Sequence, residues 1–168
     1  MANVIGTKTI KLKRYNEIEI ERVANATIYP GMLIELMTTD KVRAHNTASR
    51  NVTPKMFALE DELQGHDIDT AYAANDRVKC GIFRPGDVVY GILADGQDID
   101  IGDPLESAGG GLLQEHVVDT ADSEQAIAVY SQSIVGIALE AVDTSASSGE
   151  ESSLDPLGYA RRIKVMIT

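Results

Sequence analysis

The sequence predicts an all-β fold, organised around the stretch from Cys80 to Glu115. Short runs of β-forming residues alternate there with turn residues so closely that no helix fits between the turns. The turn at residues 84–87 reads Arg-Pro-Gly-Asp: proline presets φ at its second position and glycine accepts a positive φ at its third, as a type II turn requires. Such a density of turns predicts a compact β-meander or the wall of a barrel.

The rest of this central stretch continues the alternation of strands and turns. Residues 88–93 (VVYGIL) predict a buried strand, and residues 98–101 (DIDI) alternate acid with isoleucine, which predicts a half-buried strand. The glycines at 109–111 predict a tight turn at which a strand approaches another backbone. The turn residues on which the predicted architecture depends are Pro30, Gly31, Pro85, Gly86, Asp87, Gly102 and Asp103.

The N-terminal half repeats this chemistry. Residues 29–32 (YPGM) match the turn at 84–87 and precede an apolar strand at 33–36. Residues 15–24 alternate isoleucine with glutamate and predict a half-buried strand, although a helix competes because Glu and Arg are good helix formers. Residues 56–63 (MFALEDEL) would fit one face of a helix or of a strand, and we favour a strand followed by a turn.

The C-terminal third is predicted to contain two paired strands separated by a loop. Residues 133–142 (SIVGIALEAV) are strongly apolar, and residues 159–167 alternate isoleucine and valine with polar residues, so we expect these two segments to pair. Residues 143–155 are acidic and rich in serine, with too little apolar content to repay their ordering entropy, and predict a mobile exposed loop. Shorter β patterns lie at 41–44 and 77–82.

The charge of the chain is unevenly distributed. Its 168 residues carry a formal net charge of −11, yet residues 1–14 hold four basic residues and no acid. The length predicts a single domain, here residues 15–168, preceded by an extended basic arm at 1–14. The alternating pattern of the arm suits a strand that adds to a partner's sheet edge, and a solvated terminus is the competing interpretation. The candidate binding residues of the arm are Lys8, Ile10, Lys11, Leu12, Lys13 and Arg14.

The acidic remainder of the chain argues against binding to duplex nucleic acid, which requires a basic face. Cys80 is the one cysteine, which excludes a disulfide framework; its apolar neighbours favour a small buried side chain over a reactive thiol. No apolar run approaches the roughly 18 residues of a membrane span, so the sequence indicates a soluble protein made in a reducing compartment.

Residues that could carry chemistry are present but do not form recognisable motifs. His45, His66 and His116 lack the spacing of zinc ligands. Asp98 and Asp100 would share one strand face and could bind a cation weakly, although a solvated face is the better interpretation. The triple glycine lacks the Lys-Ser/Thr of a phosphate cradle, and no serine lies in a nucleophile elbow. We therefore expect no enzyme, no metal and no cofactor, while paired carboxylates for glycoside hydrolysis depend on folding and stay open.

Taken together, several of these segments resemble the head decoration, or cement, proteins of tailed bacteriophages. The most specific part is residues 84–113, where Pro-Gly-Asp, a short strand, Ala-x-Gly, a Gly-Asp turn and a glycine-rich turn follow one another. Residues 26–36 (ATIYPGMLIEL), the apolar segment 133–142 and the terminal strand extend the resemblance over about 24–167.

The resemblance implies a compact β-barrel or β-tulip domain that assembles as a homotrimer on the outside of the capsid. Such proteins use terminal arms to tie neighbouring major capsid subunits together, and they are not enzymes. The expected partners are therefore the major capsid protein and further copies of this chain, without nucleic acid or membrane. The expected location is the exterior of the virion, after synthesis in the host cytoplasm. Two features depart from the simplest members: the long basic segment 1–14, which fits an arm, and the acidic segment 143–155.

Two other classes of function remain open at the level of the sequence. The first is a host-attachment or glycan-binding module displayed on a virion, which the acidic loop favours and the absence of tryptophan disfavours. The second is a small trimeric β-fold enzyme acting on a nucleotide or sugar, which would need polar groups converging in a cleft. A glycan array would separate the first from a capsid protein, and an ordered cleft between subunits would support the second.

Overall fold

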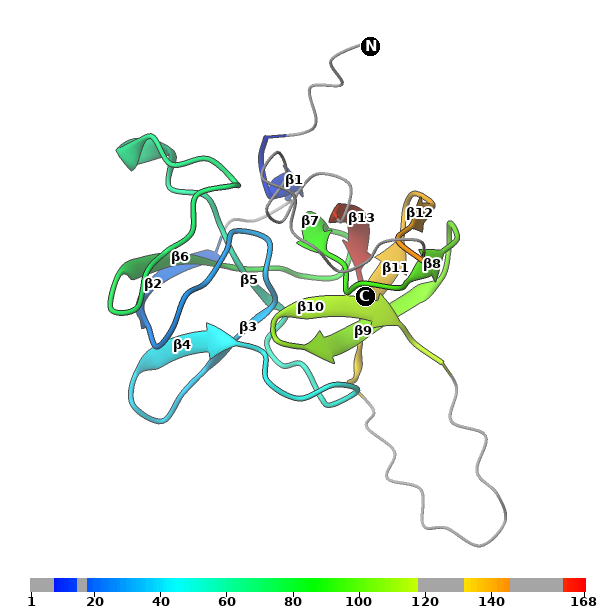
Figure 1. Ribbon diagram of the computed structural model, residues 1–168, viewed down its shortest axis with the longest axis horizontal. Coiled ribbons are helices and arrows are strands. Elements are labelled where there is room, and N and C mark those ends of the chain that lie inside the picture. The colour runs from blue at the N-terminus through cyan, green and yellow to red at the C-terminus, as the bar shows by residue number, and fades with distance from the viewer. Residues whose placement is uncertain (1–7, 15–17, 118–131, 146–161) are drawn as a thin grey trace, which may run out of the picture.

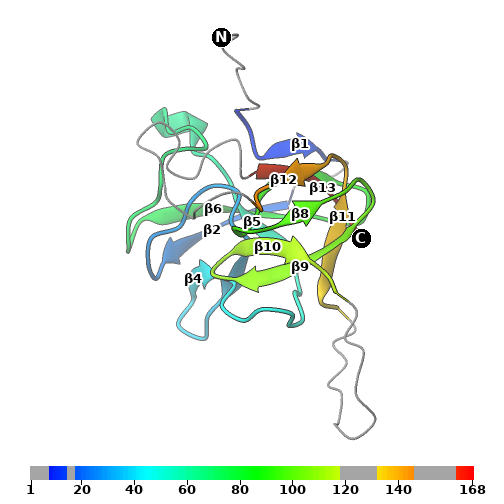
Figure 2. The same ribbon diagram turned by 45° about the vertical axis from the view of Figure 1, so that its right-hand side comes forward.

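The computed structural model describes residues 8–14, 18–117, 132–145 and 162–168, and these residues form an all-β fold (Figure 1). The strands belong to two sheets that lie side by side, with a small two-stranded ribbon beside the larger sheet (Figures 1 and 2). The one helical element in the described part of the chain is a 3-10 turn at Glu62–Gln64. The predicted all-β fold class is therefore confirmed, and the β-barrel or β-tulip detail stays a prediction.

The larger sheet contains six strands in the order β1-β7-β13-β11-β9-β10, and all neighbouring pairs run antiparallel. A parallel bridge between Leu93 and Leu113 brings the chain after β7 against β10, so the sheet curls back towards its own start. The pairing of β11 with β13 confirms the partnership expected for the two C-terminal segments. The strands are β1 (Lys11–Lys13), β7 (Val88–Ile92), β9 (Pro104–Gly109), β10 (Leu112–Glu115), β11 (Ile134–Ala138) and β13 (Arg162–Ile167).

The smaller sheet has the order β3-β4-β2-β6-β5, in which only β2 and β4 run parallel. A bridge between Leu33 and Phe57 connects its two ends. Its strands are β2 (Ile18–Ala24), β3 (Ile34–Leu36), β4 (Lys41–Ala44), β5 (Met56–Ala58) and β6 (Arg77–Ile82). The two-stranded ribbon pairs β8 (Asp98–Ile99) with β12 (Val142–Asp143).

The core explains why residues 56–63 were ambiguous in the sequence. Phe57 belongs to the larger hydrophobic cluster, whereas Met56 and Ala58 belong to a second cluster with Cys80. Strand β5 is thus buried on both faces, and such strands show a continuous apolar run without alternation. The favoured strand followed by a turn is confirmed, and Leu63, which a helix would have buried, is 90% exposed.

The predicted type II turns have the expected backbone geometry. Gly86 has φ 93° and Gly31 has φ 90°, both in the left-handed region that glycine tolerates. The turns are closed by hydrogen bonds from Asp87 N to Arg84 O (3.0 Å) and from Met32 N to Tyr29 O (3.1 Å).

An aspartate at the fourth position of a turn closes it a second time. The Asp87 carboxylate accepts a hydrogen bond from Arg84 N (2.9 Å), the first residue of the same turn. Asp103 accepts from Asp100 N in the same way (2.8 Å), with Gly102 at φ 99° between them. The Gly-Asp pairs singled out in the sequence therefore combine a positive φ with a side-chain acceptor for the turn's first N–H.

Three sequence expectations require correction. Ile101 was expected to face inwards with Ile99, but the clamped turn at 100–103 follows β8 directly and leaves Ile101 70% exposed. Asp98 and Asp100 do not share a strand face, because β8 ends at Ile99. The loop expected at 143–155 is corrected for its first residue: Asp143 lies in β12 and pairs with Asp98 of β8. Residues 146–155 lie outside the described part.

The close approach of Gly31 to the chain around it gives a testable prediction. A Cβ atom at Gly31 would overlap Nη1 of Arg162 and lie 2.9 Å from the Tyr90 carbonyl oxygen. Gly65 also has a positive φ, 74°, but nothing lies within 4 Å of the Cβ position. We expect Gly65→Ala to cost about 1 kcal/mol of strain and Gly31→Ala to cost several times more. Thermal unfolding measures both, and equal losses would contradict the predicted overlap.

Candidate functional site

The basic N-terminal segment singled out in the sequence forms part of the folded body. Strand β1 pairs with β7 in antiparallel register, with Lys11 opposite Val89 and Lys13 opposite Val88. The backbone of Tyr90 donates a hydrogen bond to Ile10 O (2.9 Å). Alternation predicted the strand, and the structure adds that the sheet edge it occupies belongs to the same chain.

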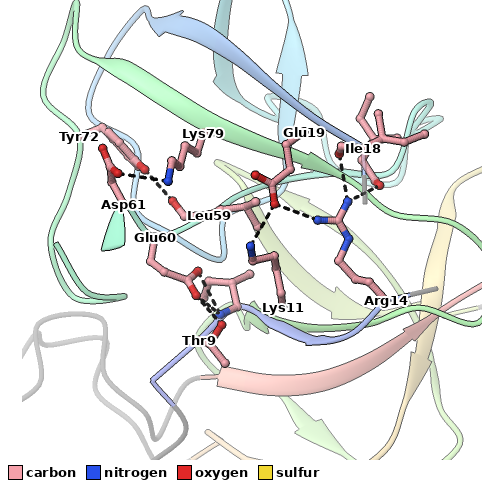
Figure 3. A network of polar contacts seen from close by, with 12 residues as sticks. Thr9, Lys11, Arg14, Ile18, Glu19, Leu59, Glu60, Asp61, Tyr72 and Lys79 are labelled. Carbon is pink, nitrogen blue, oxygen red and sulfur yellow. Dashed lines mark hydrogen bonds and ion pairs between the residues drawn. The ribbon is translucent and has the colours of Figure 1, made fainter. Parts of the chain in front are cut away.

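Two contacts fix the beginning of this segment. The Ile10 side chain has no exposed surface and lies in the larger hydrophobic cluster. Glu60, only 3% exposed, accepts hydrogen bonds from the Thr9 hydroxyl and from Ile10 N, the latter at 3.2 and 3.3 Å (Figure 3). A buried carboxylate needs such donors, so Glu60 and the N-terminal segment stabilise each other.

The end of the segment is held mainly by Arg14. Its guanidinium donates to Ile18 O (3.0 Å) and Ile82 O (3.2 Å), and it lies 4.8 Å from the centre of the Phe83 ring. Glu19 forms ion pairs with Arg14 (3.1 Å) and with Lys11 (3.0 Å), as Figure 3 shows. The side chain of Arg14 is only 2% exposed, so it cannot present its charge to a partner in this conformation.

A second polar group supports the loop that carries Glu60. Asp61 forms an ion pair with Lys79 of β6 (3.2 Å), and the Tyr72 hydroxyl donates to Leu59 O (2.7 Å) (Figure 3). Burial raises the pKa of Tyr72 well above its ordinary value, which keeps its hydroxyl protonated as a donor. These contacts hold residues 59–61 against the smaller sheet, and Glu60 therefore connects β1 to that sheet.

The prediction that residues 1–14 form an arm separate from the domain is thus corrected for residues 9–14. Ile10 and Leu12 pack against the body's own core, and Arg14 is buried against Phe83. Lys8 and Lys13 are exposed. Residues 1–7 of the predicted arm lie outside the described residues.

A third polar cluster surrounds Glu106 of β9. Its carboxylate accepts hydrogen bonds from Ser49 (2.5 Å) and Gln114 (2.9 Å), and it lies 2.7 Å from Nδ1 of His116. Burial alone would raise the pKa of Glu106, but the bonds from Ser49, His116 and Gln114 outweigh it, so the pKa falls below its ordinary 4.5. The cluster ties the loop at 45–53 to the β9–β10 hairpin.

This cluster predicts a loss of stability in acid. Because folding lowers the pKa of Glu106, its contribution is present above about pH 4.5 and is lost as the pH falls below that value. The melting temperature of the protein should therefore fall more steeply between about pH 6 and pH 3 than that of Glu106→Gln, which cannot titrate there. Parallel slopes for the two proteins would contradict a titrating role for Glu106.

One triad-like arrangement occurs among the described residues and is built for structure. His45 Nδ1 lies 2.8 Å from Ser107 Oγ, and Glu35 lies 3.8 Å from His45 Nε2. Ser107, however, has no exposed surface, and its Oγ accepts a hydrogen bond from Gly109 N (3.1 Å) in the hairpin turn. A substrate could not reach this hydroxyl without opening the hairpin.

The remaining features that the sequence analysis considered are the thiol of Cys80, metal-ligating side chains and membrane-spanning segments. Cys80 is fully buried, as expected, and burial raises the pKa of its thiol to about 12. No group of three or more His, Cys, Asp or Glu in the described parts of the chain could hold a metal ion. Nor does any helix in those parts have the length and apolar character needed to cross a membrane.

The surface carries a shallow groove of about 520 Å³ between the loop at 52–55 and the turn at 84–87. Phe83 and Pro85 line its apolar side, and Lys55 and Arg84 contribute cationic side chains. Burial lowers the pKa of Lys55, whose ammonium group donates to Ile134 O. This bond closes part of the groove, and converging acid and base groups are not found among its lining residues.

Comparisons with known proteins identify a shared fold. No protein-family model and no curated protein matches the sequence. Among solved structures, the chain is similar to the "head fiber gp8.5 N base in bacteriophage phi29", with a TM-score of 0.52 and 12% sequence identity, over 91% of this chain and 95% of that chain. At this identity the likeness shows the fold, and it extends over nearly the full length of both chains.

Proposed function

We propose that this chain is a structural protein of a tailed-phage head, which binds the outer surface of the capsid as a decoration or cement protein. The observation that carries the proposal is the fold shared with the phi29 head fiber base over nearly all of both chains. The resemblance to phage decoration proteins in residues 84–113 supports it, and that segment was recognised from turns whose geometry the structure bears out.

The physical character of the described residues suits such a role. The polar clusters around Glu60, Glu106 and Ser107 are buried and closed by hydrogen bonds, which stabilises a rigid body and leaves little for catalysis. A structural protein needs binding energy across the seams of a shell. A typical stable interface buries about 1,600 Å², and a homotrimer would multiply the effect by avidity.

The face around β1 is our candidate for the surface that meets the major capsid protein. Lys8 and Lys13 are exposed there on a chain whose net charge is −11. Strand β1 lies in the upper part of both views and β4 in the lower part (Figures 1 and 2). Cationic side chains at the rim of an interface steer association with an acidic surface, so the face around β1 would meet the shell.

A virion-displayed host-attachment or glycan-binding module is the second candidate. The observation that favours it is that the structural neighbour is described as part of a head fiber. A module of this kind would still be attached to the head. It would differ by binding a cell-surface glycan with a face other than that around β1, which a glycan array with the isolated protein would detect.

The test of the proposal uses empty heads of the phage that encodes the chain, assembled without it. We expect the purified protein to cosediment with these heads and Lys8→Gln/Lys13→Gln to bind about fivefold more weakly, a loss of about 1 kcal/mol. The matched control, Lys41→Gln/Arg77→Gln, removes the same charge near β4 and should bind as the unaltered protein does. Equal weakening by both pairs would assign the effect to net charge, and absence of cosedimentation would contradict the proposal.

A further inference from the structure

No strand adjacent in sequence connects β1 to its sheet, so its place there depends on its own noncovalent contacts. The next strand along the chain, β2, belongs to the other sheet, and the partner of β1, β7, comes far later in the sequence. The groups that receive the segment, Glu19, Glu60 and the edge of β7, all follow it in the chain. The body from β2 onwards therefore provides a complete binding slot for a strand.

This slot cannot be left empty without loss. Without β1, the buried carboxylate of Glu60 would lose the donors at Thr9 and Ile10, and the Tyr90 N–H would lose its acceptor, Ile10 O. The space that Ile10 fills within the larger hydrophobic cluster would be lined by apolar side chains. The slot thus selects a strand with a hydroxyl residue followed by a large aliphatic one, as Thr9-Ile10 provides.

The connection between β1 and β2 consists of residues 14–17 alone. Short hinge connections favour exchange of an identical element between copies, because the element from a second copy makes the same contacts. Each contact of Thr9, Ile10 and Arg14 described above can be remade in this way with the same residues.

We propose that, in the assembled protein, the slot on each body receives the 9–14 segment of a second copy of this chain. Exchange would link the copies through strand pairing and a buried side chain, Ile10, at little cost in contacts. It would also keep Lys8 and Lys13 on the same face of each body. The inference concerns self-association alone and stands independently of what the face around β1 binds.

The experiment uses the full chain with Lys13→Cys and Val88→Cys, at positions that pair across β1 and β7. Unlabelled and ¹⁵N-labelled copies are unfolded, mixed and refolded, and the two thiols are joined with a short bismaleimide. Mass spectrometry of the digest then shows whether linked peptides combine the two labels. Cys80 should not react, because it is fully buried and its thiol pKa is raised to about 12.

Exchange predicts linked peptides of mixed label at the share expected from random mixing. The matched control is Glu35→Cys/Arg43→Cys, a pair across the β3–β4 hairpin within one body, which should give links of a single label. If the Lys13→Cys/Val88→Cys protein also gives links of a single label only, β1 pairs within its own chain and the proposal is wrong. A protein that sizes as a monomer under the same conditions would overturn it equally.

Discussion

Ile10→Ala should destabilise the protein by about 2–5 kcal/mol, the usual cost of truncating a fully buried aliphatic side chain. The side chain has no exposed surface and packs in the larger hydrophobic cluster, although it lies in a terminal segment whose sequence suggests an arm. The matched variant Ile10→Val removes one methylene group and should cost only about 1 kcal/mol. Denaturant unfolding measures both changes in the free energy of unfolding.

Truncation at two positions extends this result. Removing residues 2–7 leaves Ile10 and β1 in place, so the melting temperature should stay close to that of the full chain. Removing residues 2–14 deletes β1 and leaves Glu60 without its donors, and we expect a large loss of stability. Equal stability of the two truncated proteins, or a neutral Ile10→Ala, would show that β1 is dispensable to the fold.

Arg162→Ala should cost about 3 kcal/mol or more, because it opens a cavity and leaves two buried carbonyl groups without their donor. Arg162 begins β13 and is 1% exposed; it donates to Pro30 O and to Ile68 O, each at 2.8 Å. It therefore joins the larger sheet to the turn at 29–32, and its guanidinium lies 6.0 Å from the centre of the Tyr90 ring.

Two further variants separate the causes of this loss. Arg162→Met keeps most of the side-chain volume and removes the charge along with its desolvation cost, so its loss should be smaller than that of Arg162→Ala. Lys164→Met, two residues later on the same strand, breaks a partly exposed ion pair with Glu140 and should cost less than about 1 kcal/mol. A loss at Arg162 no greater than that at Lys164 would contradict the role of Arg162 in joining β13 to the turn at 29–32.

The local elements could be predicted from the sequence because their causes are local. The turns at 29–32 and 84–87 depend on an adjacent proline and glycine at their second and third positions, and both turns have the expected geometry. Alternation identified β2 and β13 for the same reason. Ile101 shows where such prediction fails. The turn at 100–103 interrupts the alternation, so Ile101 is exposed where the pattern predicts a buried side chain.

The candidate site could not be predicted, because its contacts join distant parts of the sequence. Glu60 lies 50 residues from Ile10, and Arg162 lies 132 residues from Pro30. Arg162 alternates with apolar residues as a solvent-facing side chain would, and no neighbour in sequence signals the two carbonyl groups it meets. Similarly, the pattern of residues 9–14 predicted an added strand but did not specify which sheet edge would receive it.

The most direct test of the proposed function compares the thermal stability of heads assembled with and without this chain. A cement protein adds binding energy across the seams of the shell, so heads carrying it should disrupt at a higher temperature, and adding the purified protein to bare heads should restore the difference. Bare and decorated heads that disrupt at the same temperature would contradict a cementing role, even if the protein binds the shell.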